Sequence, residues 1–301
     1  MIPYVREFDF EYGRCHPVSP LIQRVICANP SPFTYTGTAT FIVGRAEAGA
    51  RVAVIDPGPV DEDHLDALVS ALEGRVVSHI LVTHRHRDHA PLSRPLAARI
   101  GYPPILATAS DRAPTYVSGA LDEDEDQDFT PDQALTDGQI IQGDGWTLEA
   151  ILTPGHSSDH VAFGLIEEKA LFSGDHVMGW STTIVAPPDG DMADYMASLE
   201  RIIALDFETL WPTHGPPVTE VKPFLCAYRQ HRLEREAQVL DALATGPTTI
   251  ADMVPNLYAA VDPKLWPAAS LSVLSHLIKL VKENRVISST TPDLAATYSL
   301  A

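Results

Sequence analysis

Three histidines and an aspartate lie within six residues of one another. His84, His86, Asp88 and His89 directly follow the apolar run HILV. Neutral imidazoles and carboxylates are the ligands that Zn²⁺ and its neighbouring divalent metals prefer. Successive side chains of a strand point to opposite faces, so the chain must leave the strand and curl for all four to face one point. The cluster therefore indicates a metal site on a loop at the end of a strand.

Three more candidate ligands share this setting. His156 lies in TPGHSSDH, Asp175 in LFSGD and His214 in WPTHG, and each follows an apolar strand and a small turn residue. Strand ends that converge on one edge of a sheet sandwich form an open site. Asp56, in VIDPG, has the same placement, and we expect it to accept a hydrogen bond from a ligand imidazole.

The motif HRHRDH, together with these three residues in their contexts, resembles the metallo-β-lactamase fold superfamily. The resemblance covers residues from about 36 to 217 and implies an αββα sandwich with a dinuclear metal site at one edge. It implies that the first metal is held by three histidines, His84, His86 and His156. The second would be held by Asp88, His89 and His214, with Asp175 bridging both. Every ligand position of the two-metal pattern is filled.

The rest of the chain supports a narrower resemblance. The segments SGDHVMGWSTTIV, DMADYMASLERI and YRQHRLEREAQVLDAL, followed by the C-terminal tail, are similar to the beta-lactamase-like protein 2 group. That group includes an endoribonuclease acting on single-stranded RNA and fungal thioesterases that release acyl chains. The resemblance therefore implies the fold more firmly than the substrate.

The pattern of elements indicates a layered α/β or α+β sandwich with helices outside two sheets. Together with the resemblance, it predicts an α+β fold, a four-layer αββα sandwich with a small C-terminal winged-helix domain. Short strands rich in β-branched residues and helices alternate twice before residue 220. A long polar helix over 223–245 follows, ended by Gly246 and Pro247, and then two helices and a hairpin. We expect a catalytic domain at 1–220 and the long helix with the winged-helix unit at 221–301.

Several other residues near these motifs carry weaker expectations. We expect His160 to support the site rather than bind metal, and the acidic run DEDEDQD at 122–128 to be a solvated loop. For Trp180, Thr182 and Thr183, a substrate pocket and a structural turn remain open alternatives.

Charge bears on the substrate. The chain has 21 Lys and Arg against 40 Asp and Glu, a formal net charge of −19, which disfavours nucleic-acid binding. We therefore expect a metal-dependent hydrolase that acts through metal-bound hydroxide, with Asp88 orienting the nucleophile, on an acyl ester, thioester or lactone. One alternative is an endoribonuclease on single-stranded RNA. Another is a winged-helix nucleic-acid-binding module with a regulatory metal domain, whose nearby basic residues are Lys264, Lys279, Lys282 and Arg285.

The cofactors expected are two divalent ions, with Zn²⁺ favoured over Mn²⁺ and Fe²⁺. The three cysteines, Cys15, Cys27 and Cys226, form no CxxC pair, which fits a reducing compartment. The N-terminal segment lacks the apolar core of a signal peptide, and no apolar run is long enough to span a membrane. We expect a cytoplasmic protein that needs no membrane, with a homodimer left open.

Overall fold

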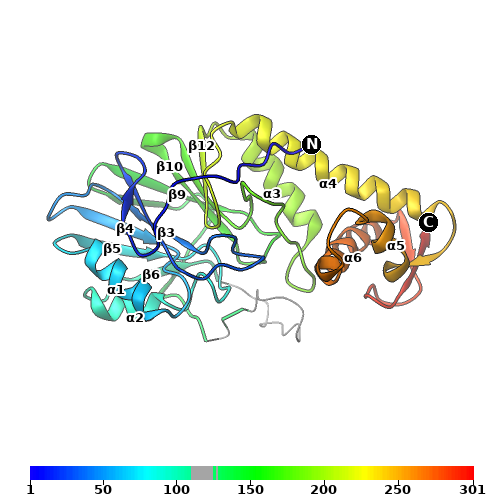
Figure 1. Cartoon of the computed structure of the whole chain (residues 1–301), viewed down its shortest axis with the longest axis horizontal. Coiled ribbons are helices and arrows are strands. Elements are labelled where there is room, and N and C mark those ends of the chain that lie inside the picture. Colours follow the sequence, from blue (N-terminus) through cyan, green and yellow to red (C-terminus); the bar gives the residue numbers. More distant parts are fainter. Residues whose placement is uncertain (110–124, 127) are drawn as a thin grey trace.

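The computed structural model describes residues 1–109, 125, 126 and 128–301 (Figure 1). Its first sheet has seven strands in the order β1 to β7. These are β1 (His16–Pro17), β2 (Ile22–Ile26), β3 (Ala39–Val43), β4 (Arg51–Ile55), β5 (Val76–Leu81), β6 (Ile105–Ala107) and β7 (Gln133–Ala134). Strands β1 to β4 pair antiparallel and β4 to β7 pair parallel.

The second sheet has five strands in the order β12-β11-β10-β9-β8. These are β8 (Ile140–Gly143), β9 (Trp146–Leu152), β10 (Val161–Leu165), β11 (Ala170–Gly174) and β12 (Thr209–Pro212), with a short 3-10 turn, η1 (Ile166–Glu168), between β10 and β11. Only β11 and β12 pair parallel in this sheet.

The core between the two sheets follows from side-chain alternation along the strands. In β3, Phe41 and Val43 face the second sheet, whereas Ile42 belongs to the cluster on the outer side. In β4, Ile55 faces inward and Val54 outward. Such strands carry apolar residues at nearly every position because both of their faces are covered.

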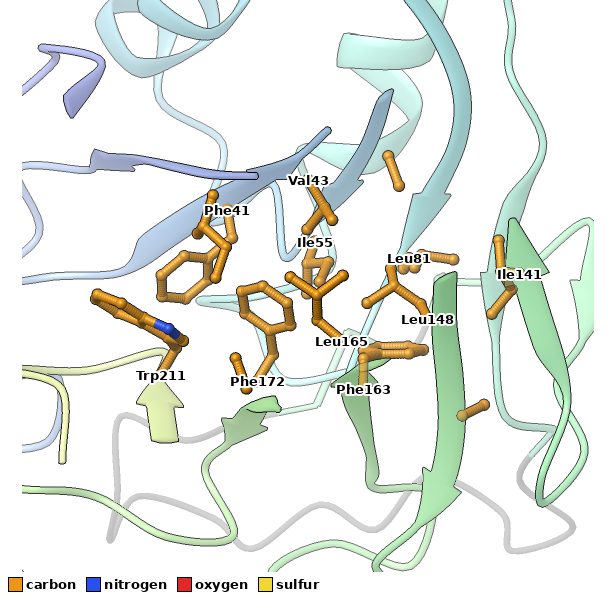
Figure 2. Close-up of a cluster of buried hydrophobic side chains, with 14 of the residues drawn as sticks. Phe41, Val43, Ile55, Leu81, Ile141, Leu148, Phe163, Leu165, Phe172 and Trp211 are labelled. Carbon is orange, nitrogen blue, oxygen red and sulfur yellow. The ribbon is translucent and has the colours of Figure 1, made fainter. Parts of the chain in front are cut away.

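Aromatic side chains fill much of the space between the sheets (Figure 2). The ring of Phe41 lies 5.0 Å from that of Phe172 and 6.1 Å from that of Trp211. Phe163, on β10, is fully buried in the same cluster. This packing holds the two sheets together, so the strand ends meet at a shared edge.

Helices cover both outer faces. On the first sheet, α1 (Glu62–Ala71) and α2 (Ser93–Arg99) contribute to the outer cluster. On the second sheet, α3 (Met192–Ala204) and α4 (Val221–Leu243) do the same. The layers are therefore helix, sheet, sheet and helix, which confirms the predicted sandwich.

The C-terminal unit has its own apolar core. It consists of β13 (Thr248–Thr249), α5 (Ile250–Leu257), η2 (Pro263–Leu265), α6 (Trp266–Lys282), β14 (Val286–Ser288) and β15 (Thr297–Leu300). Helix α4 runs from the sandwich to this unit (Figure 1). Its first half packs with the sandwich through Phe224 and Tyr228, and its last turns pack with the C-terminal unit through Val239 and Leu243. The division at residue 220 stays a prediction, because α4 belongs to both cores.

Two local features differ from the sequence expectations. Residues 36–83 have a strand-like pattern that predicts no helix, but the structure has α1 at Glu62–Ala71. Its N-terminus is capped by Asp61, whose carboxylate accepts from the amide of His64 at 2.7 Å. Most of the acidic run at 122–128 lies outside the described residues. Glu125 of that run is described and is not solvated: it is buried and pairs with Arg85 at 3.2 Å. Within the described part of the chain, no helix is long and apolar enough to cross a membrane.

Candidate metal centre

Five strand ends bring the candidate ligands together. The loop after β5 carries four of them, His84, His86, Asp88 and His89. Asp56 directly follows β4. Strands β4 and β5 are parallel, so their carboxyl ends lie at one edge of the first sheet. The other three candidates follow strands of the second sheet: His156 follows β9, Asp175 follows β11 and His214 follows β12. These strands run in one direction, because β10 is antiparallel to both β9 and β11 while β12 is parallel to β11.

The first group of donors consists of three imidazoles. His84 Nε2 lies 2.9 Å from His86 Nδ1, which lies 3.2 Å from His156 Nε2. All three rings are buried. The donor atoms lie within 4.8 Å of one another, a spacing that can hold one ion.

The second group is mixed. His214 Nε2 lies 3.0 Å from Asp88 Oδ2, and His89 Nε2 lies 3.5 Å from the same oxygen. Asp175 stands between the groups: its carboxylate oxygens lie 3.4 Å from His214 Nε2, 3.6 Å from His89 Nε2 and 3.9 Å from His156 Nε2. The structure thus brings together all seven residues named from the sequence.

The far side of each ring is held by a hydrogen bond. His89 Nδ1 donates to Asp56 Oδ2 at 2.9 Å, and His156 Nδ1 donates to the Ile184 carbonyl at 2.7 Å. His214 Nδ1 donates to the Gly37 carbonyl at 3.2 Å. These bonds leave each Nε2 lone pair directed into the site.

Asp56 ties the two sheets together behind the ligands. Its carboxylate, which is fully buried, accepts from the amide and hydroxyl of Thr83, from His89 and from the hydroxyl of Thr213. Thr83 Oγ1 in turn lies 3.0 Å from His84 Nδ1. Since the Thr83 hydroxyl donates to Asp56, His84 Nδ1 donates to it. The hydrogen bond expected from an imidazole to Asp56 is therefore present.

His160 supports a ligand as expected. Its Nε2 accepts from the backbone amide of Asp175 at 3.1 Å, so its Nδ1 donates to the hydroxyl of Thr153 at 2.7 Å. His176 is buried beside the ring of Tyr195, 4.8 Å between centroids, and takes no part in the donor groups. The Tyr195 hydroxyl donates to the His176 carbonyl at 2.8 Å.

The electrostatics divide the site in two. Burial, with the neighbouring imidazoles, lowers the pKa of His84 well below its usual value and that of His86 to about 3, so both are neutral near pH 7. Burial opposes ionisation of Asp88, but the charges of His89 and His214 outweigh it and hold the Asp88 pKa at about 2. The carboxylate of Asp175 stays ionised for the same reason, with its pKa well below the usual value. Without a metal, protonated His89 and His214 supply the positive charge, since Asp88 and Asp175 raise the pKa of both imidazoles despite their burial. Divalent cations would supply that charge instead and leave both Nε2 atoms free to bind metal.

Buried side-chain atoms without hydrogen-bond partners also indicate that the site fits a metal ion. Within the described residues, four inward-facing atoms are buried without a hydrogen-bond partner: Asp88 Oδ1, Asp175 Oδ1, His89 Nε2 and His214 Nε2. Buried polar atoms are normally satisfied, so their common direction indicates a ligand that all of them share. Nitrogen and oxygen donors of this kind fit zinc and its neighbours.

The turn that presents His156 depends on a glycine. Gly155 has φ 139°, and a Cβ there would lie 2.3 Å from Cα and 2.4 Å from the amide nitrogen of Tyr195. Backbone atoms of α3 cannot yield as a side chain can, so we expect Gly155→Ala to cost about 2–3 kcal/mol of unfolding free energy.

Denaturant unfolding measures this cost, with Gly49→Ala as the matched control. Gly49 also has positive φ, 82°, but a Cβ there meets no atom within 4 Å. The control carries the backbone strain without the close approach. Equal losses in the two variants would show that contact with α3 is not what requires glycine at position 155.

Comparison with known proteins places the chain in a family. Residues 34–214 match the metallo-beta-lactamase superfamily, and residues 249–293 match the beta-lactamase associated winged helix domain. The chain belongs to the metallo-beta-lactamase superfamily and is a hydrolase of that superfamily, with a C-terminal winged-helix domain.

The relatives agree with the narrower resemblance. A beta-lactamase-like protein 2 homolog of Caenorhabditis elegans is 31% identical over 90% of this chain and 87% of its own length. An atrochrysone carboxyl ACP thioesterase of Aspergillus chevalieri is 31% identical over 89% of this chain and 83% of its own. The crystal structure of a beta-lactamase domain protein from Burkholderia ambifaria has a TM-score of 0.79 at 22% identity, covering 96% of this chain and 94% of that one.

Proposed function

We propose that this hydrolase holds two divalent ions, with zinc favoured, and cleaves an acyl thioester, ester or lactone. The observation that carries the proposal is the arrangement of the donor atoms: a middle group of His84, His89 and Asp175 shares His84 with the first group and His89 with the second. His84, His86 and His156 would hold one ion. Asp88, His89 and His214 would hold the other, and the carboxylate of Asp175 would contact both.

The ions, when bound, would acidify a water and stabilise negative charge on the carbonyl oxygen. Asp88 has the position of the proton carrier. Its side chain is 17% exposed whereas the side chains of His89, His214 and Asp175 are at most 4% exposed, so Asp88 lies at the mouth of the site. We propose that Asp88 orients the attacking water and takes its proton.

A small acyl substrate fits the charges better than RNA. The chain carries a formal charge of −19, which opposes approach of a polyanion. Basic residues of the winged-helix unit also form ion pairs with acidic side chains: Lys279 pairs with Glu236 at 2.7 Å, and Lys282 with Asp191 at 2.6 Å. Arg285 pairs with Glu236 as well, at 2.7 Å. The name of the Aspergillus chevalieri relative, a carrier-protein thioesterase, points in the same direction.

A side-by-side assay tests the proposal. Metal-loaded protein is given a panel of acyl thioesters, esters and lactones in one arm and a labelled single-stranded RNA in the other. Asp88→Asn serves as the contamination control in both arms. We expect turnover of an acyl substrate that the variant lacks. RNA cleavage that disappears in the variant, without acyl turnover above the metal-free background, would establish the nuclease alternative instead.

A further inference from the structure

A second cavity lies between the sandwich and the C-terminal unit. Its volume is about 330 Å³, and its walls come from residues 32–33, the segment 178–184, α4, the connection between α5 and α6, and α6 itself. This size is near the lower end for small-molecule sites and suits a short chain better than a folded polymer. Trp180, Thr182 and Thr183 all line it, and the Thr183 hydroxyl also bonds to the carbonyls of Asp175 and His176, so this segment forms both a pocket wall and a hydrogen-bonded turn.

Much of the lining is apolar. The larger apolar side chains are Phe33, Met178, Trp180, Tyr258, Val261 and Leu265. Trp180 stacks on Tyr35 with their ring centroids 4.7 Å apart, which holds its ring in place. Such a wall fits an alkyl or other apolar part of a ligand.

Two arginines of α4 add positive charge to this apolar pocket. Arg232 is only 4% exposed, donates to the carbonyl of Thr183 and lies over the ring of Tyr195. Arg235 donates to the carbonyl of Leu257 at 2.6 Å and lies 4.2 Å from the ring centroid of Tyr258.

Neither arginine pairs with an acidic side chain in the part of the chain that the structure describes. Across the described residues, no carboxylate forms an ion pair with Arg232 or Arg235, although the chain has 40 acidic side chains. The neighbouring Glu236 is taken by Lys279 and Arg285. The Nε atoms of both arginines are buried without a hydrogen-bond partner. A guanidinium without an acidic partner attracts an anion into the pocket that it lines, and most strongly where it is buried, as Arg232 is.

The pocket shares a wall with the metal centre. Ile184 lines the pocket, and its carbonyl accepts the hydrogen bond from His156. Thr183 also lines the pocket, and its hydroxyl donates to the carbonyl of Asp175 at 2.7 Å. A ligand in the pocket thus lies against the segment that positions two of the candidate metal ligands.

We propose that this pocket binds the part of the substrate remote from the scissile bond, an alkyl or pantetheine chain that ends in a carboxylate or phosphate paired with Arg232 and Arg235. The inference rests on the proposed hydrolase function and adds a substrate class to it. The anion has two sources: a carboxylate on the acyl part, or the phosphate of a phosphopantetheine leaving group. Bidentate pairing with guanidinium suits either anion.

Two matched substrate pairs distinguish the sources. Succinyl and butyryl N-acetylcysteamine thioesters differ in a carboxylate on the acyl part. Butyryl-4′-phosphopantetheine and butyryl-pantetheine differ in a phosphate on the leaving group. In each pair, kcat/KM of the anionic thioester is divided by that of the neutral one. We expect Arg235→Gln to lower this ratio by about tenfold or more in the pair whose anion binds the pocket. Arg235→Lys should retain part of the ratio.

Arg229→Gln is the matched control, since it removes the same charge from α4 but from a residue that pairs with Glu200 outside the pocket. It should leave both ratios as in the wild type. Ala268→Phe, which fills the pocket from α6, should weaken the anionic and neutral members alike, and its folding is checked by its melting temperature. An unchanged ratio for both pairs in Arg235→Gln would overturn the proposal.

Direct binding separates failure of the pocket from failure of the function. Calorimetry with octanoate and with S-butyl-4′-phosphopantetheine, in wild type and Arg235→Gln, requires no turnover. The wild type could bind one probe, with affinity about tenfold weaker in Arg235→Gln, and yet hydrolyse none of the four thioesters. That result would support the pocket and reject the hydrolase proposal. Hydrolysis of a thioester without binding of either probe would support the hydrolase proposal and reject the pocket.

Discussion

Replacing Asp88 by asparagine should lower kcat/KM for the acyl substrate by about three to four orders of magnitude while the protein stays folded. The amide keeps the shape of the carboxylate but carries no negative charge and cannot take a proton. Asp88 lies 3.0 Å from His214 Nε2, and its Oδ1 is buried without a partner. The loss should therefore appear in kcat, because the group acts on the attacking water rather than on the binding of the acyl part.

Steady-state kinetics with metal-loaded protein measures this loss, and far-ultraviolet circular dichroism checks the fold. Asp241→Asn is the control, since it removes the same charge from an exposed residue of α4. Rates within about tenfold of the wild type in Asp88→Asn would show that this carboxylate is not the proton carrier.

Replacing His86 by alanine should reduce the metal content from about two equivalents per chain to about one or fewer, and the activity by at least about a hundredfold. His86 Nδ1 lies between His84 Nε2 and His156 Nε2, so its removal opens the first donor group at the centre. Because bound metal stabilises only the folded chain, the variant should also lose about 2–4 kcal/mol of the stabilisation that metal gives the wild type.

Elemental analysis of chelator-free protein gives the stoichiometry and the identity of the metal, and thermal unfolding with and without chelator gives the stability. His79→Ala is the control, because His79 lies on β5, the strand that leads to His84, and among the described residues its ring bonds only to the hydroxyl of Ser78. Wild-type protein that never exceeds one equivalent after metal addition would contradict the dinuclear proposal. Manganese or iron at full occupancy would replace zinc in it.

Features that depend on residues close together in the sequence could be predicted from it. The cluster His84, His86, Asp88 and His89 was recognisable because all four donors lie on one strand-end loop. The apolar spacing of Met192, Met196 and Leu199 predicts a helix over 192–205, and the structure has it as α3, Met192–Ala204. Helix α1 was missed, although Asp61 and the acidic first turn form an N-terminal capping signal that could have revealed it.

The buried Glu125 shows the limit of reading composition alone. A run of acidic residues predicts a solvated loop, since isolated charges are costly to bury. Here the guanidinium of Arg85, forty positions away in the chain, lies 3.2 Å from its carboxylate, so one member of the run is buried as an ion pair. The partner of a charge is a tertiary property that the local sequence does not contain.

The sequence by itself determined the identity of the seven candidate ligands and the layered fold, because residue types, strand ends and alternation are local properties. Only the tertiary structure decided which atom of each ligand faces the site. His86 presents Nδ1 and His156 presents Nε2, since the Ile184 carbonyl holds the far side of the His156 ring. It also decided that Arg232 and Arg235 meet the segment 178–184 in one pocket. In the sequence these arginines are ordinary members of a polar helix. Their charge can select an anion only because folding places it in a pocket, without an acidic partner among the described residues.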